Sequence, residues 1–265
     1  MLEVLKNTTY RHLFLAQVIA LIGTGLITIA LALQAYDIAK GQAAQVLGIA
    51  LAIKMIAYIG VAPIASAFAE RLPRKKVLVG LDVIRALTAL CLPFVTQIWQ
   101  IYILIFILQS ASAAFTPTFQ AMIPDVLPIE EEYTNALSLS RLAYDLENII
   151  SPMLAGLLLT VMSYHNLFLG TVVGFIGSAL FVVSAKLPNA KMPEFIGVYN
   201  RIKQGAKIYF RTPRLKALLA LNLAIASASA VVIVNTVVLV QTTFGLTEKA
   251  TTWAFGLFGL GSMLA

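Results

Sequence analysis

The sequence has 265 residues, of which 60% are hydrophobic and only 12% are charged, and its formal net charge is +7. Soluble domains usually carry about 25% charged residues, so this composition excludes an ordinary soluble protein. The basic residues lie in connections between long apolar runs, where membrane topology explains them better than nucleic-acid binding does. We therefore expect an all-α, polytopic membrane protein that sits in a lipid bilayer and binds no nucleic acid.

Seven apolar runs are long enough to cross a bilayer, which takes about 20 residues of helix. They cover residues 12–36, 44–69, 77–96, 98–122, 135–162, 166–186 and 215–241. An eighth run begins near Thr251 and is still apolar at Ala265. It spans only about 22 Å as a helix, less than the roughly 30 Å hydrocarbon core. We expect that run to continue in a longer protein.

The lysines and arginines predict the orientation of the chain. They gather before the first run, between the second and third runs, and between the sixth and seventh runs. The connections on the other side hold only Lys40 and Lys249. Because cytoplasmic loops carry the excess of basic residues, we expect a cytoplasmic N-terminus.

The long connection after the sixth run divides the chain. We expect a six-helix transmembrane half over residues 1–186, a cytoplasmic linker over 187–214, and the start of a second half over 215–265. Within the linker, apolar residues recur at spacings of three and four, namely Val198, Ile202, Ala206 and Tyr209. This pattern predicts an amphipathic helix at the membrane interface, with an unstructured basic linker as the alternative.

Ionisable residues inside apolar runs are costly unless they face the interior of the bundle. Lys54 lies ten residues into the second run, and we predict that it lines a transport path or pairs with a carboxylate. Asp82 and Arg85 are three residues apart in the third run, a spacing that predicts an ion pair on one helix. Arg141 and Asp145 repeat this pattern in the fifth run.

The fifth run holds two further features. Asp145 and the neighbouring Glu147 are alternative acceptors for a coupling proton, because either carboxylate would lie within a membrane span. Pro152 interrupts the backbone hydrogen bonding of the same run, which predicts either a working kink or a passive one. Glycines in the sixth run and the eighth run predict close packing of helices, and they are Gly170, Gly174, Gly177, Gly256, Gly259 and Gly261.

Enzyme signatures are missing from the sequence. Its two histidines, His12 and His165, are far apart, and they form neither a metal-protease pair nor a partnership with the lone Cys91. No nucleotide-binding motif is present. We expect no catalytic residue, no metal site and no cofactor.

The loop between the second and third runs, SAFAERLPRKK from Ser66 to Lys76, carries a family resemblance. It resembles the hallmark loop of the major facilitator superfamily, G-x-x-x-D-R-x-x-R-[RK]-[RK], with Ser66 for the usual Gly and Glu70 for the usual Asp. The stretch SPMLAG, which contains Ser151, Pro152 and Gly156, is similar to the antiporter motif of the family's fifth span. The similarity is strongest to the drug-efflux branch, which includes macrolide and siderophore exporters.

This resemblance implies a twelve-span fold, of which seven or eight spans are present here. It also implies a cytoplasmic gate, for which we take Glu70, Arg71, Arg74 and Lys75 of the loop together with Asp82 and Arg85.

The implied function is secondary active transport across the bacterial inner membrane. A small molecule, a drug or another toxic compound would be exported by alternating access, with protons as the coupling ion. A looser similarity of residues 123–147 to bacterial nickel-resistance exporters makes efflux of nickel or cobalt the alternative. A membrane receptor or scaffold that transports nothing is the alternative from another class.

Overall fold

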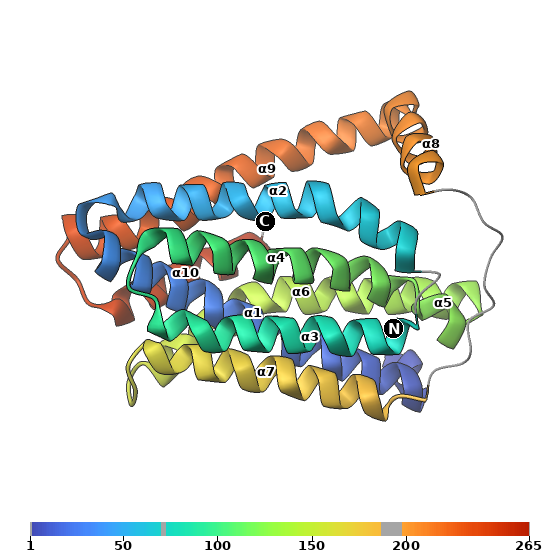
Figure 1. Cartoon of the computed structure of the whole chain (residues 1–265), viewed down its shortest axis with the longest axis horizontal. Helices are drawn as coiled ribbons and strands as arrows, with labels where there is room; N and C mark the ends of the chain where they lie inside the picture. Colours follow the sequence, from blue (N-terminus) through green and yellow to red (C-terminus); the bar gives the residue numbers. More distant parts are fainter. Residues whose placement is uncertain (1, 70–72, 187–197, 265) are drawn as a thin grey trace.

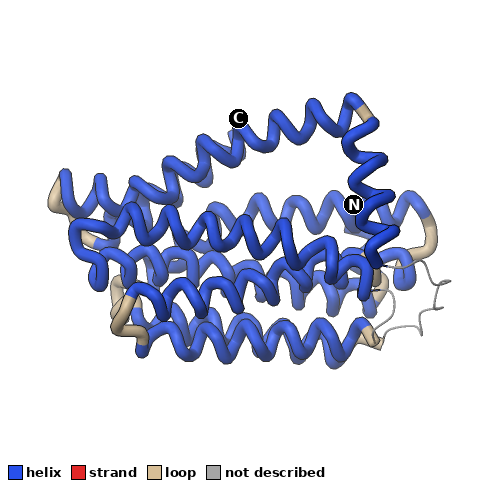
Figure 2. Tube along the Cα trace, turned by 45° about the horizontal axis from the view of Figure 1, so that its top comes forward, coloured by secondary structure: helices blue, strands red, loops and turns tan. Residues whose placement is uncertain are grey.

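The computed structural model describes residues 2–69, 73–186 and 198–264, and the regular elements in these ranges are all helices (Figures 1 and 2). The predicted all-α fold is therefore confirmed. The long helices are α1 (Thr8–Ala39), α2 (Ala43–Ala69), α3 (Arg74–Cys91), α4 (Ile98–Gln120), α6 (Glu130–Leu158), α7 (His165–Ser184), α9 (Pro213–Val238) and α10 (Glu248–Leu264). The shorter elements are η1 (Leu2–Lys6), η2 (Lys40–Gln42), η3 (Leu92–Phe94), α5 (Ile123–Val126), α8 (Val198–Arg211) and the π-helical turn η4 (Leu239–Thr243).

Six segments of the described ranges are long and apolar enough to cross a membrane. They are Thr8–Ala39, Ala43–Ser66, Arg74–Phe94, Ile98–Val126, His165–Ser184 and Pro213–Thr243. The expected fifth and eighth spans, α6 and α10, fall outside this set. The first turn of α6 is acidic and its middle carries further charges, and α10 has only 17 residues. With its 29 residues, α6 is still about 43 Å long and lies inside the bundle (Figure 1).

Helix α1 is the central helix of the bundle. It is apolar on all sides, which is typical of a helix that is buried all round. It packs against α2, α6 and α7, while α3 packs on α4 and α7. Small residues allow the closest of these approaches: a Cβ atom on Gly174 of α7 would lie 3.1 Å from the Cα of Gly23 in α1. Helices in lipid associate through such close contacts.

Helix α9 meets the other spans at only one end. Its first half is exposed, whereas Val237 near its end is fully buried in an apolar cluster with Ala35 of α1 and Leu47 of α2. Figures 1 and 2 show α9 diverging from α2 toward α8. The bundle is therefore closed at the end that holds this cluster. It spreads apart at the end that carries α8, which is the predicted cytoplasmic side.

A polar contact lies at the same closed end. The hydroxyl of Tyr164, in the turn between α6 and α7, donates a hydrogen bond of 2.6 Å to the carboxylate of Asp37. Burial raises the pKa of Tyr164, and the nearby carboxylates of Asp37 and Glu248 raise it further. The hydroxyl therefore keeps its proton at neutral pH and ties the end of α1 to the start of α7.

Candidate substrate cavity and gate

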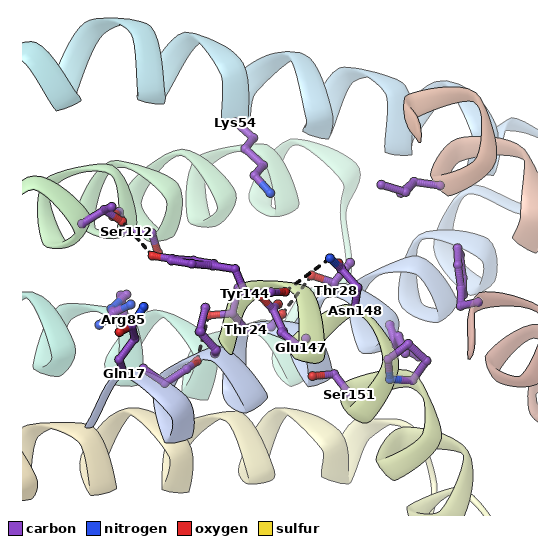
Figure 3. A pocket seen from close by; sticks show the side chains of 18 of the residues that line it. Gln17, Thr24, Thr28, Lys54, Arg85, Ser112, Tyr144, Glu147, Asn148 and Ser151 are labelled. Atoms are coloured by element: carbon purple, nitrogen blue, oxygen red, sulfur yellow. Dashed lines mark hydrogen bonds between the residues drawn. The ribbon is translucent and has the colours of Figure 1, made fainter. Parts of the chain in front are cut away.

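A cavity of about 290 Å³ lies in the middle of the bundle, where Figure 3 shows its polar side chains. Its walls come from α1, α2, α3, α4 and α6, and α9 and α10 complete them with Ile233, Phe255 and Phe258. Polar and charged lining residues are Gln17, Thr24, Thr28, Lys54, Tyr58, Arg85, Ser112, Thr116, Tyr144, Glu147, Asn148 and Ser151. The volume is close to the lower end of ligand pockets, which begin at about 300 Å³.

Lys54 of α2 and Glu147 of α6 both line this cavity (Figure 3). They are near enough to interact electrostatically, but their charged atoms do not come within the 4.0 Å of an ion pair. Across the described ranges, Lys54 has neither a hydrogen bond nor an ion pair. The structure thus places Lys54 on the cavity wall, and no carboxylate among the described residues forms an ion pair with it; its place in a transport path stays a prediction.

The two alternative proton acceptors lie on different faces of α6. Glu147 lines the cavity, whereas Asp145 is absent from the lining and forms an ion pair of 3.4 Å with Arg141. Both members of that pair are well exposed, with side-chain exposures of 39% for Asp145 and 79% for Arg141. Two residues correspond to about 200° around a helix, which explains why one carboxylate faces inward and the other outward.

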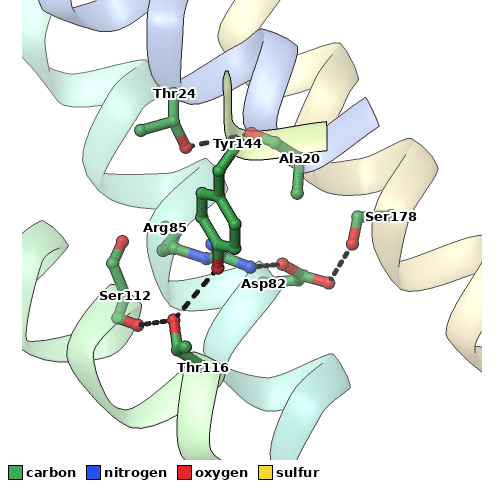
Figure 4. A network of polar contacts seen from close by, with 8 residues as sticks. All are labelled: Ala20, Thr24, Asp82, Arg85, Ser112, Thr116, Tyr144 and Ser178. Carbon is green, nitrogen blue, oxygen red and sulfur yellow. Dashed lines mark hydrogen bonds and ion pairs between the residues drawn. The ribbon is translucent and has the colours of Figure 1, made fainter. Parts of the chain in front are cut away.

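The expected ion pair between Asp82 and Arg85 is present and deeply buried (Figure 4). Asp82 also accepts a hydrogen bond of 2.8 Å from Ser178 of α7. The guanidinium of Arg85 lies between two aromatic rings, 4.2 Å from the centre of Phe115 and 4.5 Å from that of Phe175. These contacts fix the position of Arg85 on the cavity wall, since cation–π contacts and the ion pair all restrain one planar group.

Several lining residues did not emerge from the sequence. Gln17 accepts a hydrogen bond of 2.9 Å from Ser140, and the hydroxyl of Tyr144 contacts that of Thr116 at 3.5 Å. A signal for part of this lining was present in α1. Gln17, Thr24 and Thr28 are seven and four residues apart, so they share one helix face within an apolar run.

The expected gate residues have contacts at the end of the bundle near α8. Arg74 donates a 2.7 Å hydrogen bond to the carbonyl of Ala121 and pairs with Asp125, and Lys75 donates a 2.9 Å hydrogen bond to the carbonyl of Ala185. Both basic side chains thus satisfy carbonyls at the C-terminal ends of helices, where positive charge is favourable. These contacts join parts of the first six spans, and a lock between two halves stays a prediction. Glu70 and Arg71 lie outside the described residues.

The motif of the fifth span lies where α6 meets α1 and α10. A Cβ atom on Gly25 of α1 would come within 2.1 Å of the Ser151 side chain. A Cβ atom on Gly156 would come within 2.8 Å of the hydroxyl of Thr252 in α10. These two glycines therefore allow α6 to pack closely against both α1 and α10. A larger residue at Gly25 would clash with Ser151, and a larger residue at Gly156 would clash with Thr252.

Pro152 affects the contact between α6 and α10. Proline has no amide hydrogen, so the carbonyl of Asn148, four residues earlier, loses its helical partner. A Cβ atom on Gly259 of α10 would lie only 2.3 Å from this carbonyl oxygen. The close packing expected for Gly259 is thus confirmed. For Gly261 the described residues do not bear out the same expectation, because none of their atoms would lie within 4 Å of a Cβ atom on that residue.

A bundle of long apolar helices around a central cavity with ionisable walls is the architecture of a polytopic membrane transporter. Residues 13–265 match the family model described as Major Facilitator Superfamily. The chain therefore belongs to this superfamily, as its loop motif predicted.

Curated relatives match at modest identity. The uncharacterized MFS-type transporter YfiS of Bacillus subtilis is 25% identical over 207 residues, which are 76% of this chain and 49% of that protein. Macrolide efflux protein A of Streptococcus pyogenes is 27% identical over 177 residues, 65% of this chain and 43% of that protein. The chain spans about half the length of the curated relatives it matches.

Solved structures share the fold. The nucleoside transporter NupG matches with a TM-score of 0.76 at 14% identity, over 96% of this chain and 65% of that one. A bacterial homolog of the human lysosomal transporter Spinster, solved in an inward-facing and unoccupied conformation, matches with a TM-score of 0.74 at 10% identity, over 94% and 58% of the two chains. At these identities the likeness shows the fold alone.

Proposed function

We propose that this protein is a secondary exporter that moves a small organic molecule out across the bacterial inner membrane by alternating access, with Glu147 as its proton site. One observation carries the proposal: Glu147 and Lys54 line one central cavity as ionisable groups without an ion-pair partner among the described residues. Ionisable groups inside a membrane bundle mark substrate paths and proton relays. The names of relatives, macrolide efflux proteins among them, support export as the direction.

The walls of the cavity favour an organic substrate over a metal ion. They contain one carboxylate, that of Glu147, and neither a histidine nor a cysteine among the described lining residues. Nickel and cobalt bind best to several convergent nitrogen or sulfur ligands. Aromatic and aliphatic side chains such as Phe115, Phe255 and Phe258 instead suit the carbon skeleton of a small molecule.

Charge-neutralising variants of two carboxylates on α6 test the proposal. The full-length gene is expressed in a drug-sensitive bacterial host, survival against a panel of macrolides and nickel salts identifies a substrate, and efflux is then driven by a pH gradient in vesicles. We expect Glu147→Gln to abolish most gradient-driven efflux, because glutamine cannot take up and release a coupling proton within the membrane.

Asp145→Asn is the matched control, because it makes the same chemical change two residues away on the exposed face of α6. It should leave efflux close to that of the unchanged protein at equal abundance in the membrane. Equal efflux by Glu147→Gln and the unchanged protein would show that the proton site lies elsewhere. A complete lack of substrate-dependent phenotype would favour a receptor or scaffold.

A further inference from the structure

Helix α8 carries basic side chains that no described protein group binds. Lys203, Lys207 and Arg211 follow one another at intervals of four residues, so they share one face of this helix, and all three are exposed. Across the described ranges, none of these three residues, the basic row of α8, forms an ion pair or a hydrogen bond. Arg214 and Lys216 extend the positive charge into the start of α9 and are exposed as well. The basic row is therefore available to an anionic partner.

The depth of α8 relative to a bilayer follows from α9. Only Thr212 separates the two helices. The exposed large apolar residues of α9 begin at Leu218, five residues or about 8 Å after Pro213, and α9 contains no charged residue after Lys216. The polar headgroup layer on each side of the hydrocarbon core is about 5–8 Å thick. With Leu218 at the edge of the hydrocarbon, α8 lies at the level of the headgroups.

The direction of α8 and its exposed apolar residues also fit the surface of a membrane. Figures 1 and 2 show α8 running crosswise to α9, so it lies along the plane of the membrane that α9 crosses. Ile208 and Phe210 are 56% and 59% exposed, and they lie on either side of the basic row. Helices that combine basic and large apolar side chains in this way bind at the boundary between headgroups and acyl chains.

We propose that the basic row of α8 binds the phosphate groups of anionic phospholipids, such as phosphatidylglycerol, and that Ile208 and Phe210 contact the adjoining acyl chains. The negative charges of these lipids lie at the depth of the basic row. Each lysine or arginine near an anionic membrane surface strengthens binding about fivefold. The inference goes beyond the proposed function and is independent of it, because α8 contributes nothing to the described lining of the cavity.

Soluble anions fit this surface less well. Free phosphate or a nucleic acid would neutralise the same charges, but it would leave the side chains of Ile208 and Phe210 in contact with water. A phospholipid covers both kinds of residue, because its charged phosphate and its apolar chains meet at the depth where α8 lies.

A fluorescent label on α8 of the full-length protein tests the proposal. Gly205→Cys in a Cys91→Ser background provides the attachment site, because Gly205 is exposed and a Cβ atom there would meet no described atom within 4 Å. The labelled protein is placed in phosphatidylcholine nanodiscs in which phosphatidylglycerol replaces a rising share of the lipid. We expect the fluorescence to change with this share and to saturate. Salt at about 1 M should weaken the response, because it screens charges beyond about 3 Å.

Charge-removing variants identify the residues that bind the lipid. Lys207→Gln should raise the share of phosphatidylglycerol at half-saturation about fivefold, and the triple variant Lys203→Gln, Lys207→Gln, Arg211→Gln should abolish the response. Lys207→Arg keeps the charge and should retain the affinity. Lys249→Gln is the matched control, because this exposed lysine follows Glu248 at the closed end of the bundle, and it should leave the response unchanged.

Three results would overturn the proposal. One is a fluorescence that stays constant over the whole range of phosphatidylglycerol. Another is an equal response of the triple variant and the unchanged protein. The third is an equal change caused by inorganic phosphate or RNA in nanodiscs of phosphatidylcholine alone, which would assign the basic row to a soluble anion.

Discussion

Arg85 combines a structural role with a place on the cavity wall. Its guanidinium is bound to Asp82 and stacked between Phe115 and Phe175, and its Nε still lacks a partner among the described residues. A buried ion pair is weak evidence for stability when it is intact. Removing one partner is different, because the other charge is then left buried and uncompensated.

Asp82→Asn should therefore destabilise the protein strongly. Asp82 is completely buried, and its loss as an anion leaves Arg85 without a counter-charge, which costs about 3–5 kcal/mol. Thermal unfolding of the purified protein in detergent measures the change. Arg141→Gln breaks an exposed pair of the same type and should cost less than about 1 kcal/mol. Similar losses from both variants would contradict this account.

At the scale of elements, α6 and α10 can approach each other closely because glycines lie at their contact. Gly156 accommodates Thr252, and Gly259 lies against the carbonyl that Pro152 leaves without a helical partner. Both glycines face a neighbour across the same pair of helices. Pro152 and Gly156 of α6 thus act together with Gly259 of α10, which lies about a hundred residues later in the sequence.

Gly259→Ala should separate α6 from α10. The new methyl group would lie 2.3 Å from the carbonyl oxygen of Asn148, which belongs to the backbone and has little freedom to move. Overpacking of this kind costs about 1–3 kcal/mol. Melting temperature and substrate efflux should both fall. Gly261→Ala adds the same methyl group two residues later, where no atom of the described residues lies within 4 Å, and should be neutral or slightly stabilising. A neutral Gly259→Ala would refute the proposed contact.

At the scale of the whole molecule, the cavity is lined both by helices that precede the long connection in the sequence and by helices that follow it. α1, α2, α3, α4 and α6 supply most of its walls, and α9 and α10 supply the rest. The apolar cluster around Val237 holds these two groups together at one end, while α9 diverges from α2 at the other end. Such an arrangement suits alternating access, in which the two groups would rock about a central site.

The predicted orientation places the spreading end of the bundle, with α8, in the cytoplasm and the closed end outside. Labelling of cysteines tests this orientation. In a Cys91→Ser background, Lys249→Cys should react with a membrane-impermeant maleimide added to intact cells, and Lys207→Cys of α8 should react only after the cells are permeabilised. Both lysines are exposed in the structure, so the membrane alone should decide their accessibility. The reverse pattern would place α8 and the spreading end of the bundle outside the cell.

The sequence by itself determined the local features of this protein. Helices satisfy their backbone hydrogen bonds internally, so composition over about 20 residues is enough to locate a span. The helix expected from the spacing of apolar residues between Val198 and Tyr209 is present as α8. The depth of Lys54 within an apolar run likewise marked it as unusual before any contact was known.

Only the tertiary structure decided which residues meet. Glu147 rather than Asp145 lines the cavity because of the rotation of α6, which depends on its neighbours α1 and α10. Tyr164 reaches Asp37 across 127 positions of the chain. Contacts of this kind follow from the packing of small residues between helices, and apolar composition is nearly the same on every face of such a helix. Hydropathy therefore locates the spans, and close packing determines the cavity that they enclose.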